Sequence, residues 1–335
     1  MPNLTEKDLN KLNNKIKESS QFLQKYFNYL LVIRNRSAGT LRTYVYRLLD
    51  FFKYMVCVRE YGDEEQINNL SDKELLTLIK NKVDKSFVET IEEFDILSFL
   101  YYIQRKGTKV STRNNYLSAI KSFFKYCSKK YGIKDVAVDI ESAKLEEKQP
   151  IFLTLDECKS VIEYARNKSS KRDYCILILF LNCGMRISEL ISINKSDITG
   201  TTIKIMGKGS KERTVYLNEA CLRAIEDCLK ETLNYTRIVD KEALFVSMKT
   251  GKRLSVRRIE QIISNMMAEC GLSDKGYSPH KLRHTAATIM YQNGTDIRAL
   301  KDILGHTELS TTQIYTHIND EKLQEAINNN PIGKL

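Results

Sequence analysis

The chain has 335 residues, of which 42% are hydrophobic and 28% are charged, and its formal net charge at pH 7 is +11. This length and composition are typical of a globular protein of about two domains and exclude a fibrous or wholly disordered chain. The excess of lysine and arginine favours a polyanionic partner such as nucleic acid, although a basic protein without such a partner has the same composition.

The sequence carries no signal for export or membrane insertion. It begins Met1-Pro-Asn-Leu-Thr without an apolar signal-peptide core, and no apolar run approaches the roughly 20 residues that a membrane-spanning helix needs. None of its eight cysteines forms a C-x-x-C pair, and several stand within apolar runs. We therefore expect buried free thiols and a cytoplasmic protein with no membrane partner.

Residues 1–140 are expected to form a helical domain, because no long alternating run occurs in them. Two segments resemble each other weakly: Thr40-x-x-x-Tyr44 is followed by Phe51-Phe-Lys-Tyr54, and Thr112-x-x-x-Tyr116 is followed by Phe123-Phe-Lys-Tyr126, at an offset of 72 residues. Each segment has apolar residues at helical spacing. The pattern indicates either an internal repeat or two similar amphipathic helices with chance matches.

Charge is uneven within this first domain. Between Tyr101 and Lys134 there are nine Lys or Arg and no Asp or Glu, whereas Glu60 to Asp95 holds eleven acidic residues and four lysines. The basic stretch predicts a phosphate-contacting helix face, with an ordinary solvated face as the alternative, and the acidic stretch is expected to face away from DNA. The candidate DNA-contacting residues are Thr40, Arg42, Arg47, Arg113, Lys121 and Lys125.

The charged stretch 141–150, which ends in Pro150, is the expected linker, and residues 151–335 form the second expected domain. A capping box from Thr154 to Glu157 begins its first helix. Alternation over 202–206 and 213–217, around the turn at Gly207–Glu212, predicts a β-hairpin. Helices are expected at about 155–166, 172–182, 218–233, 256–270, 279–292, 296–304, 311–317 and 320–328. The fold class is mainly α with a small antiparallel β-sheet.

All four histidines lie in the last sixth of the chain, at positions 280, 284, 306 and 317. His280 and His284, four apart on one expected helix, could share a metal ion, but no acidic residue lies between Lys275 and Asp296. A second possibility is that the histidines are structural, which we prefer for His317. The third is an anion site.

The anion site is indicated by the start of the helix at Pro279. His280 and Arg283 are three residues apart and therefore on one side of the helix, near the positive end of its dipole. The planar guanidinium of arginine matches two phosphate oxygens. This arrangement suits a negatively charged phosphoryl group.

Five motifs in order then resemble one family. They are Cys-Gly-Met-Arg186-Ile-Ser-Glu189-Leu, the Gly-Lys208-Gly turn, His280-Lys-Leu-Arg283-His284-Thr-Ala-Ala-Thr, Leu-Gly-His306, and Thr-Thr-Gln-Ile-Tyr315-Thr-His. In this order and spacing they resemble the catalytic domain of the tyrosine recombinases of phage-integrase type, and the Xer group in particular. The resemblance is close over residues 150–330. Over residues 20–135 it is looser and implies a helical, SAM-like core-binding domain that clamps DNA.

The resemblance implies a role for each motif residue. Arg186 and Arg283 would clamp the scissile phosphate, and Tyr315 would attack it to form a 3′-phosphotyrosyl link. Lys208 would protonate the 5′-hydroxyl leaving group. His280 would assist proton transfer, and His306 would bind a non-bridging oxygen. Glu189 and His284 would support the others.

Elementary chemistry agrees with these roles. Catalysis of phosphoryl transfer depends mainly on positioning and on stabilising charge, which many enzymes achieve with metal ions held by carboxylates. Here the motifs supply the cations Arg186, Lys208 and Arg283 instead, so we expect no metal or ATP requirement. A tyrosine phenol, with a pKa of about 10, ionises more easily than an alkyl hydroxyl and is a reasonable nucleophile.

The resemblance further implies recombination by a tetramer on two DNA sites, with the helix at about 320–327 docked on a neighbouring subunit. A second recombinase or an accessory protein is a further expected partner. We expect Xer-like resolution of chromosome or plasmid multimers. The alternatives are an integrase of a mobile element, an enzyme of the topoisomerase IB type, and a non-catalytic DNA-binding protein that would not need Tyr315.

Overall fold

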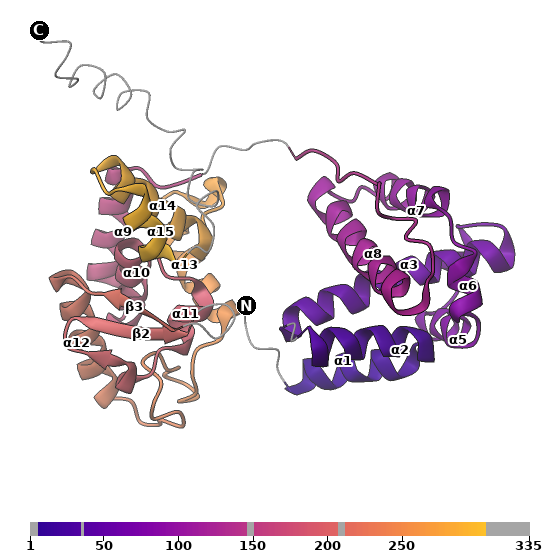
Figure 1. Ribbon diagram of the computed structural model, residues 1–335. Helices are drawn as coiled ribbons and strands as arrows, with labels where there is room; N and C mark the ends of the chain where they lie inside the picture. Colours follow the sequence, from indigo (N-terminus) through magenta and orange to yellow (C-terminus); the bar gives the residue numbers. More distant parts are fainter. Residues whose placement is uncertain (1–5, 35–36, 146–150, 207–211, 306–335) are drawn as a thin grey trace, which may run out of the picture. The chain divides into compact units, whose positions relative to one another are not determined.

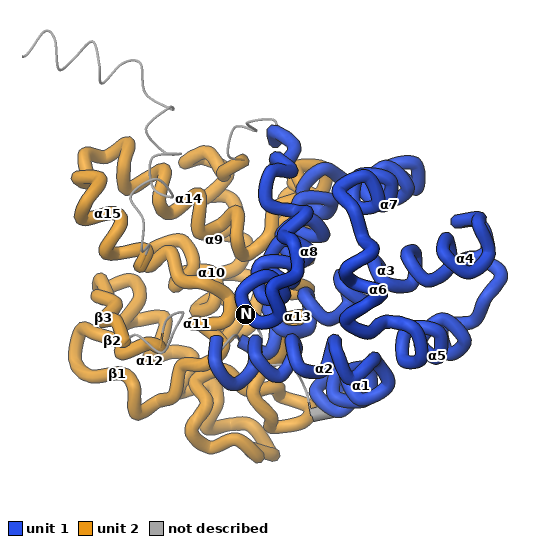
Figure 2. Tube along the Cα trace, turned by 45° about the vertical axis from the view of Figure 1, so that its right-hand side comes forward, with its two compact units in different colours: residues 1–147 blue, residues 148–335 orange. Residues whose placement is uncertain are grey.

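The computed structural model describes residues 6–34, 37–145, 151–206 and 212–305. These residues are mainly helical with one small antiparallel sheet, which confirms the expected fold class. The chain divides into two compact units, residues 1–147 and residues 148–335 (Figure 2). None of the described helices is long and apolar enough to cross a membrane.

Helices are the regular secondary structure of unit 1 in its described residues (Figure 1). Its two longest helices, α3 and α8, pack against each other and contain the two similar segments of the sequence. Shorter helices cover them. The elements are α1 (Glu6–Glu18), α2 (Gln21–Asn28), the π-helix η1 (Tyr29–Ile33), α3 (Ala38–Tyr61), α4 (Gln66–Asn69), α5 (Asp72–Lys82), α6 (Lys85–Glu89), α7 (Glu93–Arg105) and α8 (Val110–Tyr131).

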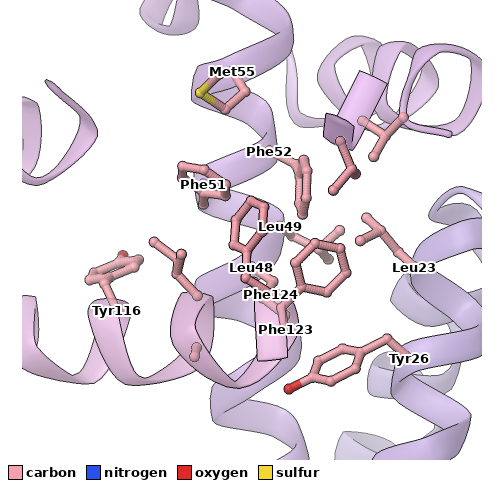
Figure 3. Close-up of a cluster of buried hydrophobic side chains, with 14 of the residues drawn as sticks. Leu23, Tyr26, Leu48, Leu49, Phe51, Phe52, Met55, Tyr116, Phe123 and Phe124 are labelled. Atoms are coloured by element: carbon pink, nitrogen blue, oxygen red, sulfur yellow. The ribbon is translucent and has the colours of Figure 1, made fainter. Parts of the chain in front are cut away.

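The core of unit 1 is rich in aromatic side chains, which pack with leucine and methionine side chains (Figure 3). Phe51 and Phe52 of α3 and Phe123 and Phe124 of α8 are all fully buried. The rings of Phe52 and Phe123 meet edge to face with centroids 5.4 Å apart, a geometry that aromatic pairs prefer. The matched Phe-Phe pairs of the two segments therefore have a packing role, because both supply side chains to one core.

The acidic stretch of unit 1 forms the end of α3, the helices α4 to α6 and the first turn of α7, and much of its charge is balanced within the unit. Asp72 pairs with both Lys15 and Lys53, and Asp95 lies 2.8 Å from Arg59. Further pairs join Glu60 to Lys82 and Glu64 to Arg105. Each pair has at least one side chain that is 44% exposed or more, so each contributes little to stability.

Unit 2 combines helices with a small sheet that buries one face and exposes the other. Its elements are α9 (Leu155–Lys168), α10 (Lys171–Cys183), α11 (Ile187–Ser192), η2 (Lys195–Asp197), β1 (Ile198–Thr199), β2 (Thr202–Met206), β3 (Glu212–Tyr216), α12 (Glu219–Leu233), α13 (Val256–Glu269), η3 (Ser273–Lys275), α14 (Pro279–Gln292) and α15 (Ile297–Leu304). The sheet order is β1-β2-β3 and both pairings are antiparallel. The predicted hairpin is present, and the helices expected at 311–317 and 320–328 lie outside the described residues.

Capping side chains begin several helices of unit 2 where the sequence places them. Thr154 and Glu157 form the capping box of α9, and Ser255 caps α13. Ser278 caps α14, and Pro279 occupies its first turn, where a missing N–H costs nothing. The positive end of the α14 dipole therefore lies at His280, as predicted.

The buried helix α10 ends where the candidate site begins. It packs against α9, α12 and α14, and its residues from Cys175 to Phe180 are all buried. Gly184 ends it in the left-handed conformation, with φ of 56°, and a Cβ atom there would come within 2.8 Å of Leu304 Cδ2. Glycine therefore permits both the sharp turn toward Arg186 and the close approach of α15.

The cysteines of the structure are free thiols, seven of them buried and Cys270 partly exposed. Cys183 of α10 and Cys221 of α12 place their sulfur atoms 3.8 Å apart without a bond. Burial raises the pKa of the Cys127 thiol to about 12 and that of Cys158 to about 11. Such thiols behave as small apolar side chains, in agreement with the sequence-based expectation.

Candidate active site

The candidate site lies in unit 2, where the ends of several elements meet. Arg186 is the residue that precedes α11, and Glu189 stands in the first turn of that helix. His280, Arg283 and His284 belong to the first two turns of α14. The carboxyl end of α15 completes the group. These elements bring together residues from three of the five motifs.

Glu189 is the centre of the group and is only 2% exposed. One of its carboxylate oxygens accepts hydrogen bonds from the Arg186 backbone N–H at 2.8 Å and from Arg213 Nη2 at 3.0 Å. The other accepts from Arg186 Nη1 at 2.8 Å. Arg283 Nη1 lies 3.9 Å from the carboxylate. One buried anion thus stands among three guanidinium groups.

The ionisation of Glu189 follows from these contacts. Burial alone would raise the pKa of the carboxyl group, but the charge of Arg213 and the hydrogen bonds from Arg186 and Arg213 outweigh burial. The pKa of Glu189 therefore lies below its ordinary value. A carboxylate that is charged at neutral pH can hold the arginines in fixed positions.

The same three arginines bind the carboxyl end of α15. Arg213 Nη1 donates to the carbonyl of Ile303, Arg283 Nη2 donates to Leu304 at 2.6 Å, and Arg186 Nη2 donates to Gly305 at 3.0 Å. The last carbonyl groups of a helix have no partners within the helix and carry partial negative charge. Three successive carbonyls therefore hold three cationic side chains together.

The arginines differ in exposure. The side chain of Arg186 is 34% exposed, whereas that of Arg283 is 3% exposed and also donates to Gly184 O at 2.7 Å. Arg186 is therefore the more accessible donor, and Arg283 is the more rigid one. Two planar donor groups, one hydrogen-bonded to Glu189 and one 3.9 Å from it, can bind a phosphate diester through several oxygens.

The two histidines of α14 form a pair. His280 Nε2 lies 3.1 Å from His284 Nε2, and the rings are nearly perpendicular. Burial, followed by the charges of Arg283 and Arg186, lowers the pKa of His280. Burial and the proximity of His280 lower the pKa of His284 to about 4. Both imidazoles are therefore neutral at pH 7, a state suited to sharing a proton with a neighbour.

Three predicted catalytic residues lie outside the described residues: Lys208, His306 and Tyr315. The strands β2 and β3 that flank the turn of Lys208 are described, as is α15, which ends just before His306. The roles assigned to these three residues remain predictions. Within the described part of the chain, no cluster of three or more His, Cys, Asp or Glu side chains is arranged to hold a metal ion.

Arg213 is a site residue that the sequence-based reasoning missed. It stands on β3, and its partners Glu189 and Ile303 are 24 and 90 residues away in the chain. An arginine in an alternating strand resembles an ordinary exposed position. The one signal for Arg213 in the sequence was its place five residues after Lys208, a residue of the matched catalytic motifs.

The six candidate DNA-contacting residues lie on α3 and α8 of unit 1, and Arg47 and Lys121 contact other elements or more distant residues of the unit. Arg47 stacks 4.1 Å from the centre of the Tyr116 ring, whose hydroxyl donates to Asp50 at 2.9 Å. Lys121 Nζ donates to the carbonyl of Val138 at 3.1 Å. Arg47 and Lys121 thus help to fix the fold of unit 1.

The other candidates are closer to solvent. Lys125 and Arg42 are exposed, and Arg42 lies over the ring of Tyr46 at 5.8 Å. Thr40 is partly buried beside the helix cap Ser37, and Arg113 is partly buried. Contact with DNA remains a prediction for all six residues.

Comparison with known proteins identifies the class to which this fold and site belong. Residues 151–322 match the family model described as the phage integrase family, and residues 23–85 match the phage integrase N-terminal SAM-like domain. The chain therefore belongs to the phage integrase family of tyrosine recombinases.

Its curated relatives place it more narrowly. It is 37% identical over 317 residues to tyrosine recombinase XerC of Caldanaerobacter subterraneus subsp. tengcongensis, covering 93% of this chain and 87% of that protein. It is 30% identical to XerD of Oceanobacillus iheyensis, covering 90% and 95% of the two chains. A XerH recombinase bound to palindromic difH substrate matches with a TM-score of 0.69 and 26% identity, over 98% of this chain and 91% of that one. The protein is a site-specific tyrosine recombinase of the Xer type.

Proposed function

We propose that the protein cuts and rejoins duplex DNA at a specific site through a 3′-phosphotyrosyl link to Tyr315, with Arg186 and Arg283 on the scissile phosphate. The observation that carries this proposal is the buried Glu189 carboxylate, which holds Arg186 at 2.8 Å and lies 3.9 Å from Arg283. A pair of guanidinium groups positioned in advance stabilises charge on the transferring phosphoryl group without rearranging during the reaction.

The chemical step balances without a cofactor. The Tyr315 phenol loses its proton, with His280 assisting that transfer, and its oxygen attacks phosphorus. The bond from phosphorus to the 5′-oxygen breaks, and Lys208 supplies the proton that the 5′-hydroxyl gains. The phosphotyrosyl diester preserves the bond energy, so a DNA 5′-hydroxyl reverses the step during rejoining without ATP. His280 and His306 assist with the proton and the non-bridging oxygen, and Glu189 and His284 support them. The three cationic motif side chains replace a metal ion.

We further propose a role in resolving multimers of chromosomes or plasmids in the cytoplasm, by a tetramer assembled on two DNA sites. Identity to XerC and XerD proteins supports this role, and the XerH chain bound to difH supports duplex DNA as the partner. A second recombinase or an accessory protein completes the assembly.

The test is covalent capture of DNA in the cell from which the chain comes. The protein is recovered under denaturing conditions, as wild type and as Tyr315→Phe, and the attached DNA is sequenced. We expect DNA on the wild type alone, at one locus near the replication terminus. DNA at the end of a mobile element would instead assign an integrase role. Equal recovery with both forms would exclude Tyr315 as the nucleophile.

A further inference from the structure

We propose that Arg213 is a positioning residue of the cleavage reaction, which holds Glu189 and the carboxyl end of α15 so that Arg186 and Arg283 meet the phosphate as a pair. The inference rests on the proposed function, because it concerns the phosphate clamp of that reaction. It adds a third arginine to the site, from a strand that carries none of the matched catalytic residues.

The contacts of Arg213 connect two separate parts of the site. Its Nη2 lies 3.0 Å from a Glu189 carboxylate oxygen, and its Nη1 donates to the carbonyl of Ile303. The side chain is 14% exposed, and its Nε is buried without a hydrogen-bond partner among the described residues. A guanidinium group can span a carboxylate and a carbonyl in this way because its donors form a rigid planar fork.

The backbone at Gly305 is shaped around this side chain. Gly305 has a φ of 64°, and a Cβ atom there would come within 2.8 Å of Arg213 Cδ and 2.9 Å of Arg213 Nε. The arginine therefore lies directly against the end of α15. Gly305 also accepts the hydrogen bond from Arg186 at 3.0 Å, so the position of Arg213 and that of Arg186 depend on the same short backbone segment.

Loss of Arg213 would therefore disturb the clamp through its two anchors, which are the Glu189 carboxylate and the carboxyl end of α15. Glu189 would lose one of its cationic partners, and the carbonyl end of α15 would lose one of its three arginines. Arg186 is attached to both anchors, and Arg283 is attached to the second. A displacement of about 1 Å at a reacting group can lower a rate by about 100-fold. Neither Arg186 nor Arg283 needs to be altered for this loss to occur.

The test uses the full chain and the DNA site recovered by covalent capture, in a nicked form that traps the phosphotyrosyl product. The variant is Arg213→Gln. Its matched control is Arg253→Gln, because Arg253 also joins a carboxylate, Asp240 at 3.0 Å, to backbone carbonyls of Ile191 and Ile193. Both variants are first checked by thermal unfolding.

The readout is the rate of covalent capture on two substrates, an ordinary phosphodiester and a methylphosphonate at the scissile position. The methylphosphonate lacks the charged non-bridging oxygen that the arginines neutralise, so it depends less on their alignment. We expect Arg213→Gln to slow cleavage of the diester by about 100-fold and cleavage of the methylphosphonate by much less. Arg253→Gln should affect both substrates equally.

Four outcomes would overturn the inference. An equal loss on both substrates would make Arg213 a structural residue only, and an unchanged rate would make it dispensable. Restoration of the rate by a sulfur in place of the 5′-bridging oxygen, a leaving group that needs no proton, would mean that Arg213 acts through Lys208. If Arg213→Gln does not fold, Arg213→Lys provides the same comparison, since it keeps the charge without the fork. A wild type that forms no covalent product on either substrate would overturn the proposed function and this inference with it.

Discussion

The two units of the chain place charge in opposite ways. In unit 1 the core is rich in aromatic side chains, and the ion pairs reach solvent. The Asp72 side chain is 57% exposed, and its partners Lys15 and Lys53 are each 16% exposed. In unit 2 a carboxylate that is 3% exposed stands among three arginines. Burial of charge is costly unless every group is paired.

Charge is buried at the Glu189 cluster of unit 2 and lies near the surface in unit 1. This difference indicates that the Glu189 cluster is retained for function although it lowers stability. An apolar group could fill the space of Glu189 without the expense of removing ions from water. A cluster that keeps its charges buried, with each one held by a carboxylate or a helix end, provides cations that are already in position for a phosphate. Unit 1 has no comparable cluster among its described residues. When one of its surface ion pairs separates, water can solvate both charges, so the pair adds little to stability.

The largest effect is expected from Glu189→Gln. The amide replaces an anion with a group that also carries N–H donors, which face the donors of Arg186 and Arg213. We expect a loss of about 3–5 kcal/mol in the free energy of unfolding, the usual result of breaking a buried ion pair. Cleavage should fall with it by about 100-fold or more, since the clamp loses its centre. Chemical denaturation and covalent capture measure the two losses.

A control separates the site from general instability. Glu157→Gln removes the capping-box carboxylate of α9, which lies in the same unit and contacts Lys275 and Tyr277. Its cost should be about 1 kcal/mol, with little change in cleavage. If Glu189→Gln kept full cleavage activity, the carboxylate would not organise the arginines.

The helix limits of unit 2 could be predicted because local chemistry determines them. Thr154 and Pro279 act within one turn of their own position, and the alternation of β2 depends on adjacent residues. The six-residue helix α11 and the two-residue strand β1 were not predicted, because both are too short to show a period. Periodicity needs several turns before it distinguishes a helix from a loop.

The site was predictable in part for the same reason. His280 and Arg283 lie on one helix, so their spacing placed them together, whereas Arg186 and Glu189 were indicated only by the resemblance of their motif, because α11 was not predicted. Arg213 reaches the site only through the tertiary fold, because its partners come from α11 and α15. No local pattern distinguishes an arginine that points to solvent from one that points to a carboxylate brought from elsewhere in the chain.

A smaller effect is expected from the pH dependence of stability. The pKa of His284 is about 4 in the folded protein against an ordinary value of 6.5, so the unfolded chain binds the proton more readily. Stability from this group is present above pH 6.5 and is lost as the pH falls toward 4. His284→Gln should flatten the decline in the free energy of unfolding over this window. An unchanged slope between wild type and variant would show that His284 is not held neutral by the fold.

The smallest effect is expected at Asp72, the carboxylate of unit 1 that pairs with two lysines near the surface, as Glu189 pairs with arginines in the interior of unit 2. Asp72→Asn removes two ion pairs at once, to Lys15 and Lys53, yet we expect a loss of only about 1 kcal/mol or less. The dependence on salt concentration tests whether burial explains why the two substitutions differ in cost. Because the Debye length falls from about 10 Å at 0.1 M to about 3 Å at 1 M, the cost of Asp72→Asn should largely disappear in 1 M salt. The cost of Glu189→Gln should persist there, since ions do not reach a buried carboxylate. Chemical denaturation of both variants at the two salt concentrations measures these costs. If 1 M salt reduced the cost of Glu189→Gln as much as that of Asp72→Asn, the Glu189 cluster would be open to solvent and would not be a preorganised clamp.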